Sequence, residues 1–156
     1  MKKEILKFGD ARAEASYYSH VCKVGDLLFV AGQTAANPGT GKVVKDLSDL
    51  PPEDAKLLSS GDMHVDARDG AIMAQTWSIY QNFKRILEAN GSSLNDIVKT
   101  NIYMRNLRKD FSAFSRVRKM FIKKDPPAST VIETPALGPT DDVLIEIECI
   151  AVVSGK

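Results

Sequence analysis

Two glutamates interrupt the most apolar stretch near the end of the chain. Glu146 and Glu148 stand among Leu144, Ile145, Ile147, Ile150, Val152 and Val153. Their spacing of two residues predicts that both carboxylates lie on the same face of a strand. An ionised carboxylate is not buried alone, so each of them needs a partner or water. Either both point to solvent from a one-sided sheet, or one lies in a cleft with a raised pKa and acts as a general acid or base.

The sequence contains few residues or motifs that would support other kinds of catalysis. Its only histidines are His20 and His64, too few for a conventional zinc site or a serine–histidine triad. The common nucleotide-binding, zinc-protease and nucleophile-elbow motifs are missing. We therefore expect neither a metal nor an organic cofactor. Cys22 and Cys149 stand apart without a CxxC spacing, which predicts two reduced cysteines in a cytoplasmic protein.

Basic residues crowd one segment, residues 105–124, in which Asp110 is the only acid. The segment forms either a solvated helix face balanced by the acidic residues 46–69 or a surface for nucleic acid. A nucleic-acid surface needs aromatic residues between the charges for stacking. Here Phe111, Phe114 and Phe121 have the spacing of core residues instead. Because the formal net charge is only +1, we expect neither nucleic acid nor a membrane as a partner.

Residues 72–104 predict a helix, a stop and a strand, in that order. Positions at spacings of three and four residues form one helix face: Ile72, Thr76, Ile79, Phe83 and Ile86. Asn90-Gly91 ends the helix, because glycine adopts the left-handed conformation after a helix without a Cβ penalty. The period then changes to two, the pattern of a strand with one buried face, at Val98, Thr100, Ile102 and Met104.

Shorter elements are predicted before this helix. Residues 20–24 and 27–31 flank Gly25-Asp26 and predict a β-hairpin. The polar residues 2–17 predict a loosely attached arm. Residues 46–69 are acidic and are broken by prolines, serines and a glycine, so they predict an irregular insertion. This insertion is either a solvated surface loop or a lid over a site.

The remaining elements complete a single domain over residues 1–156. Residues 111–121 predict a second helix with Asp110 as its N-cap. Residues 130–132 predict a short strand and residues 144–153 a closing strand. This order of elements indicates an α+β fold, a two-layer α/β sandwich with two helices on one face of a mixed sheet.

A series of segments resembles the RidA/YjgF family, also called endoribonuclease L-PSP, in the order that the family has them. Residues 24–33 (VGDLLFVAGQ) resemble the family's opening strand, and residues 37–41 (NPGTG) resemble its turn. Further similar segments are residues 86–94 (ILEANGSSL), 96–100 (DIVKT), 128–131 (ASTV) and 145–151 (IEIECIA). The resemblance covers almost the whole chain from Tyr18 onward.

The resemblance implies a chorismate-mutase-like fold and a homotrimer with a barrel-like centre and ligand clefts between subunits. It also implies hydrolysis of reactive enamines and imines to 2-keto acids with release of ammonia. The family's carboxylate-binding arginine is replaced here by Ala128, which cannot form an arginine's two parallel hydrogen bonds. We therefore expect a metal-independent deaminase or hydrolase whose small substrate differs from classical 2-iminoacids. The alternatives are a non-catalytic metabolite-binding trimer and an RNA-acting translation inhibitor.

The resemblance also assigns roles to individual residues. Glu146 would position or activate the hydrolytic water, Tyr18 and Thr130 would hydrogen-bond the substrate, and Gly32 would let it approach the backbone. Arg118, one helical turn from Ser115, is a candidate substitute for the missing arginine. The other expected substrate-binding positions are Ala31, Ser115, Ala128 and Ser129.

Overall fold

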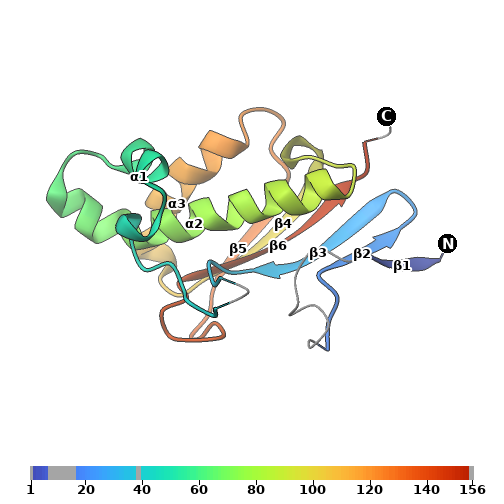
Figure 1. Cartoon of the computed structure of the whole chain (residues 1–156), viewed down its shortest axis with the longest axis horizontal. Helices are drawn as coiled ribbons and strands as arrows, with labels where there is room; N and C mark the ends of the chain where they lie inside the picture. The colour runs from blue at the N-terminus through green and yellow to red at the C-terminus, as the bar shows by residue number, and fades with distance from the viewer. Residues whose placement is uncertain (1, 7–16, 38–39, 155–156) are drawn as a thin grey trace.

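The structure, a computed structural model, describes residues 2–6, 17–37 and 40–154, and has two layers (Figure 1). One layer is a six-stranded sheet in the order β1-β2-β3-β6-β4-β5. Its strands are β1 (Lys3–Leu6), β2 (Val21–Val24), β3 (Leu27–Gln33), β4 (Ile97–Met104), β5 (Ala128–Glu133) and β6 (Ile145–Val152). Only β4 and β5 pair in parallel, so the sheet is mixed. The predicted α+β fold class is confirmed.

The first three strands form a continuous antiparallel ribbon. β2 and β3 make the predicted hairpin, in which Gly25 has a positive φ of 58°. The predicted loose arm is wrong for its first residues, because β1 pairs along its whole length with β2. Main-chain pairing to an existing strand holds these four residues, and Leu6 also packs against the core. The middle of the expected arm, residues 7–16, lies outside the described residues.

The other layer contains three α-helices: α1 (Pro52–Leu58), α2 (Met63–Ala89) and α3 (Leu107–Phe121). Two 3-10 turns, η2 (Leu47–Asp49) and η3 (Leu94–Asp96), complete it. The prediction of an irregular insertion is wrong, because residues 46–69 contain η2, α1 and the start of α2. Pro52 fits the first turn of α1, where its missing N–H would have no partner. The Asp62 side chain caps α2 by accepting hydrogen bonds from the backbone N–H groups of His64 and Val65.

The start of α3 also differs from the prediction. Asn106, rather than Asp110, is the N-cap residue, and its own side chain makes no capping bond. A distant residue supplies the cap, since the backbone N–H of Leu107 donates to Glu133 Oε2 at 2.8 Å. Asp110 lies buried in the first turn, and burial raises its pKa. A cap that comes from β5 has no local pattern in the sequence of the helix.

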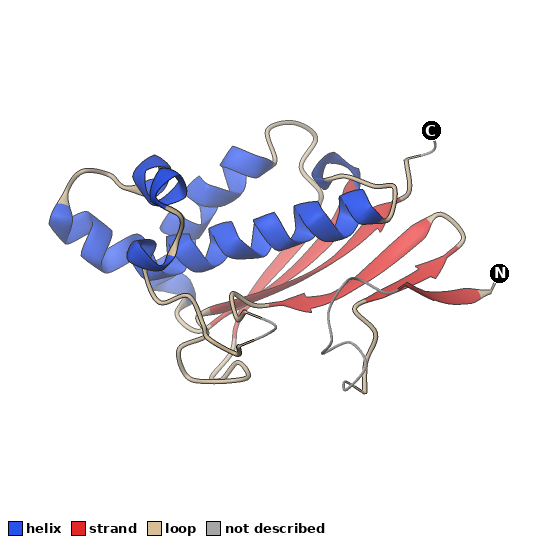
Figure 2. Cartoon of the chain, viewed as in Figure 1, coloured by secondary structure: helices blue, strands red, loops and turns tan. Residues whose placement is uncertain are grey.

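The helices cover only one face of the sheet (Figure 2). Between the layers lies the core, where Tyr80, Phe83 and Phe114 are fully buried against Ile145 and Ile147 of β6. No helix of the described chain lies over the other face. We call it the open face, and its residues include Leu27, Phe29, Ala31, Asn101, Tyr103, Glu146, Glu148 and Ile150.

In the basic segment, residues 105–124, the charged side chains form a helix face and most of the aromatic side chains pack in the core. Arg116 forms an ion pair with Asp69 at 2.9 Å, which joins the segment to the acidic residues before it. Phe114 is fully buried, and Phe121 stacks on Tyr80 with ring centroids 5.2 Å apart. Phe111 is 41% exposed. This arrangement fits the prediction of a solvated face better than a stacking surface for nucleic acid.

Two further expectations concern the cysteines and the membrane. Cys22 and Cys149 are both free thiols, as predicted. Across the part of the chain that the structure describes, no helix has the length and apolar character needed to cross a membrane.

Candidate functional site

Glu146 and Glu148 lie on the open face of β6, as their spacing predicts. Ile145, Ile147 and Cys149, which alternate with them, are buried beneath the helices. Both glutamates are half-buried although no helix covers them. They therefore occupy hollows in the open face rather than a flat solvated surface.

Gly32 in β3 makes room for the Glu146 side chain. A Cβ atom built at Gly32 would lie 1.9 Å from Glu146 Oε1 and 2.9 Å from its Cδ. Any side chain at position 32 would therefore have to displace the carboxylate. The pairing of β3 with β6 also changes register between Val30 and Gln33, next to this contact. The glycine and the irregular strand together let Glu146 lie across β3.

Glu146, Gly32 and Tyr18 line a single cleft of about 380 Å³, which we call the Glu146 cleft. The rest of its lining consists of His20, Gln33, Thr34, Ala36, Asn82, Gly138 and Pro139. Tyr18 is 58% exposed, so a ligand can reach it. Three of the expected site residues thus meet within one chain.

The surroundings of Glu146 favour its protonated form. Burial raises the pKa of Glu146, and the negative charge of Glu148 raises it further. No ion pair to a described lysine or arginine opposes this effect. Glu148 itself is held by hydrogen bonds from Asn101 Nδ2 at 2.7 Å and the Tyr103 hydroxyl at 3.4 Å. A carboxylate with a raised pKa is a stronger base, as general base catalysis requires.

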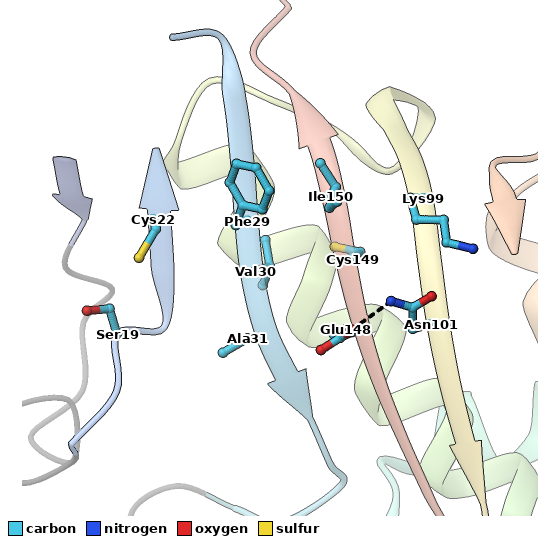
Figure 3. Close-up of a pocket in the computed structure, with 10 residues that line it drawn as sticks. All are labelled: Ser19, Cys22, Phe29, Val30, Ala31, Lys99, Asn101, Glu148, Cys149 and Ile150. Carbon is cyan, nitrogen blue, oxygen red and sulfur yellow. Dashed lines mark hydrogen bonds between the residues drawn. The ribbon is translucent and has the colours of Figure 1, made fainter. Parts of the chain in front are cut away.

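Ala31 belongs to a different pocket, shown in Figure 3. This pocket of about 300 Å³ surrounds Glu148 on the open face. Glu148 and Asn101, joined by the dashed hydrogen bond, belong to its polar lining, while Phe29 and Ile150 supply apolar surface (Figure 3). Ala31 therefore does not line the Glu146 cleft, although the next residue in the chain does.

The expected substrate-binding residues of β5 lie apart from the Glu146 cleft of their own chain. β5 is an edge strand, and β4 separates it from β6. Thr130 accepts a hydrogen bond from Lys99 Nζ at 2.7 Å, and Ala128 is the register partner of Lys99. Ser129 accepts a hydrogen bond from Thr100 Oγ1 at 3.1 Å and points toward the helix layer. The expected site is thus divided into two parts within one chain.

Ser115 and Arg118 lie in the helix layer, on the other side of the sheet from Glu146. Arg118 donates a hydrogen bond to Ser115 Oγ at 3.4 Å and stands 5.0 Å over the Phe114 ring. Neither residue lines the Glu146 cleft or the pocket around Glu148. Within one chain, Arg118 therefore does not take the place of the missing arginine. Helical spacing places Arg118 beside Ser115, but it does not show which side of the sheet the helix occupies.

Several residues of the cleft were not expected there. Among them are His20, Gln33 and Asn82. The sequence contained a signal for the first two, since His20 stands two residues after Tyr18 and Gln33 follows Gly32 directly. Asn82 lies on α2, and only the packing of this helix on the sheet brings it to the cleft.

The fold defines a class of protein that is already known from solved structures. A protein from Klebsiella pneumoniae has the same fold, with a TM-score of 0.82 and 35% sequence identity, over 88% of this chain and 100% of that one. Among curated relatives, a RutC family protein of Pyrococcus abyssi is 34% identical over 151 residues, which are 97% of this chain and 98% of the relative.

A third relative carries the name of an enzyme. It is the 2-iminobutanoate/2-iminopropanoate deaminase of Dermatophagoides farinae, 27% identical over 136 residues, which are 87% of this chain and 85% of the relative. The family model described as endoribonuclease L-PSP matches residues 52–153. The chain belongs to this family, and the predicted RidA/YjgF membership is confirmed.

Proposed function

We propose that this chain is a deaminase that hydrolyses a small reactive imine or enamine in the Glu146 cleft. The observation that carries the proposal is Glu146, a half-buried carboxylate with a raised pKa that lies across Gly32 and faces the same cleft as Tyr18. The deaminase name of the Dermatophagoides farinae relative supports it.

The proposed reaction needs one well-placed base and no metal. A water molecule held by Glu146 adds to the electrophilic imine carbon, while the carboxylate accepts a proton from that water. The Tyr18 hydroxyl forms a hydrogen bond to the substrate and holds it at the correct distance. The resulting carbinolamine then loses ammonia and leaves a carbonyl compound. The glycine at position 32 keeps the base in the geometry that this addition needs.

We further propose that a homotrimer completes the site. The open face exposes apolar side chains that a partner would cover, namely Ile5, Leu27, Phe29 and Ile132, each between 38% and 50% exposed. β5 carries Ala128 and Thr130 on an unpaired edge. In the proposed assembly, β5 of one chain lies against the Glu146 cleft of the next, so that each cleft contains residues of two chains.

This chain lacks the arginine that would bind the carboxylate of a classical 2-iminoacid. Ala128 offers no guanidinium group, and the cation beside it is Lys99, already bound to Thr130. A lysine ammonium is a point charge, whereas arginine binds a carboxylate through two parallel hydrogen bonds. A small imine or enamine whose binding does not require a carboxylate group fits this arrangement.

An ammonia-release assay on freshly generated imines of varied structure tests the proposal. We expect turnover by the native chain and a loss of at least about 100-fold in Glu146→Gln, because the amide keeps the shape but cannot accept the proton. Glu88→Gln, an exposed position on α2, is the matched control and should turn over like the native chain. Binding of these compounds without any turnover would show a non-catalytic binding protein instead.

A further inference from the structure

We propose that His20 is the second proton-carrying residue of the Glu146 cleft and that it protonates the substrate nitrogen. This inference rests on the proposed deaminase function and adds a residue to it. Addition of water to an imine, the first stage of its hydrolysis, requires two proton transfers in opposite directions, one from water and one to nitrogen. Glu146 provides for the first, and the described cleft offers His20 for the second.

The position of His20 is well defined by the main chain. Its backbone carbonyl accepts a hydrogen bond from the N–H of Ala31 at 2.9 Å, which fixes this residue just before β2. Its ring lies 5.7 Å from the Tyr18 ring, with an angle of 50° between the planes. The ring of His20 therefore lies beside the ring of Tyr18, and both residues line the cleft.

The imidazole of His20 contains a polar atom without an assigned role. Nε2 is shielded from solvent and has no hydrogen-bond partner in the described structure. A buried polar atom without a partner destabilises the folded chain, so such atoms are rare unless a ligand or another chain supplies the partner. At a cleft wall, a substrate nitrogen is a partner of the right chemistry.

Other polar side chains that line the cleft form hydrogen bonds with residues close to them in the sequence. Gln33 Nε2 donates to the carbonyl of Ala31 at 3.0 Å, and Thr34 Oγ1 accepts from the N–H of Ala36 at 3.4 Å. Asn82 Oδ1 accepts a hydrogen bond from Arg85. Unlike these side chains, His20 combines a place in the lining of the cleft with a buried nitrogen that has no partner among the described residues.

The two residues together complete a balanced cycle. His20, as imidazolium, gives a proton to the imine nitrogen, and the water oxygen then bonds to carbon as the C=N π electrons move to nitrogen. Glu146 takes the proton of that water, which yields a neutral carbinolamine. Glu146 next returns its proton to the amine nitrogen, the C–N bond breaks, and His20 recovers a proton from the hydroxyl group. The products are a carbonyl compound and ammonia, with both residues restored.

Replacement of the two histidines of this chain tests the inference. His20→Gln keeps hydrogen-bonding atoms but cannot carry a proton, so kcat should fall by about 100-fold or more while KM changes little. His64→Gln is the matched control, because His64 is exposed at the start of α2. In His20→Ala, free imidazole should restore part of the lost kcat, which a purely structural role would not allow.

The outcomes separate this inference from the proposed function. If the native chain is active, Glu146→Gln is inactive and His20→Gln keeps the native kcat, the role of His20 is overturned and the deaminase stands. If His20→Gln instead loses the assembly in sedimentation and imidazole restores nothing, His20 is a subunit contact and the inference fails. If the native chain hydrolyses no imine, the deaminase function and the role of His20 are both wrong.

Discussion

The two faces of the sheet differ in what their side chains are free to do. On the covered face, Ile145, Ile147 and Ala151 of β6 are fully buried beneath α2 and α3. On the open face, Glu146 and Glu148 of the same strand are half-buried, and Glu148 accepts a hydrogen bond from Asn101. Because side chains alternate along β6, those on the covered face stabilise the fold and those on the open face are available for chemistry. Substitutions on the two faces should therefore change different measurements.

The largest expected effect is on the covered face. Ile147→Ala should lower the free energy of unfolding by about 2–5 kcal/mol, because it opens a cavity in a fully buried position. Ile150→Ala, three residues later on the open face, is the matched variant and should cost the single chain much less. Urea unfolding of both variants checks this difference.

The same pair also tests the proposed trimer. If other chains cover the open face, the cost of Ile150→Ala should depend on protein concentration, whereas the cost of Ile147→Ala should keep a concentration-independent part. If the native chain sediments as a stable monomer at micromolar concentration, the proposed trimer is wrong.

The next effect concerns the edge of the open face. Ala128→Arg should raise ammonia release from 2-iminopropionate-type substrates by about 10-fold or more, since a hydrogen bond to a charged group contributes about 1.5–3 kcal/mol. Ala89→Arg, at the exposed end of α2, controls for the added charge. Native activity on these substrates as high as that of the Arg variant would contradict the proposed substrate class.

A smaller loss is expected when the contact of Glu146 with β3 is disturbed. Gly32→Ala should lower turnover by about 10-fold, because the new methyl group displaces the carboxylate, whose flexible end can move without unfolding the chain. Gly138→Ala places a methyl group in the wall of the same cleft with nothing within 4 Å of it. Circular dichroism should show both variants folded, and equal turnover in the two would refute the special role of Gly32.

The smallest effect is on stability and depends on pH. Burial raises the pKa of Glu146 above its ordinary value of 4.5, so the folded chain binds this proton more tightly than the unfolded chain does. The stabilisation that this proton gives is complete below the unfolded pKa and is lost as pH rises through the folded pKa. Glu146→Gln should therefore be more stable than the native chain at neutral pH, with an advantage that disappears toward pH 4. Urea unfolding across that range measures it.

Much of the local structure follows from periodicity, and two of the wrong predictions share one cause. The helix end at Asn90-Gly91 and the strand that follows were predicted correctly, since Gly91 has a φ of 72° and β4 runs from Ile97 to Met104. The pairing of β1 and the cap of α3 by Glu133 were missed. Each depends on a partner that is distant in the sequence, and a local pattern contains no information about such partners.

The sequence by itself determined which residue types can do chemistry and which of them share a face. Glu146 and Glu148 must lie on one side of a strand, because the side-chain period of a strand is two. Only the tertiary structure decided their neighbours. The antiparallel pairing of β3 with β6 brings Gly32 under Glu146, and the strand order puts β4 between β6 and Thr130. Distances across a sheet depend on strand order and register, which the packing of the whole chain selects.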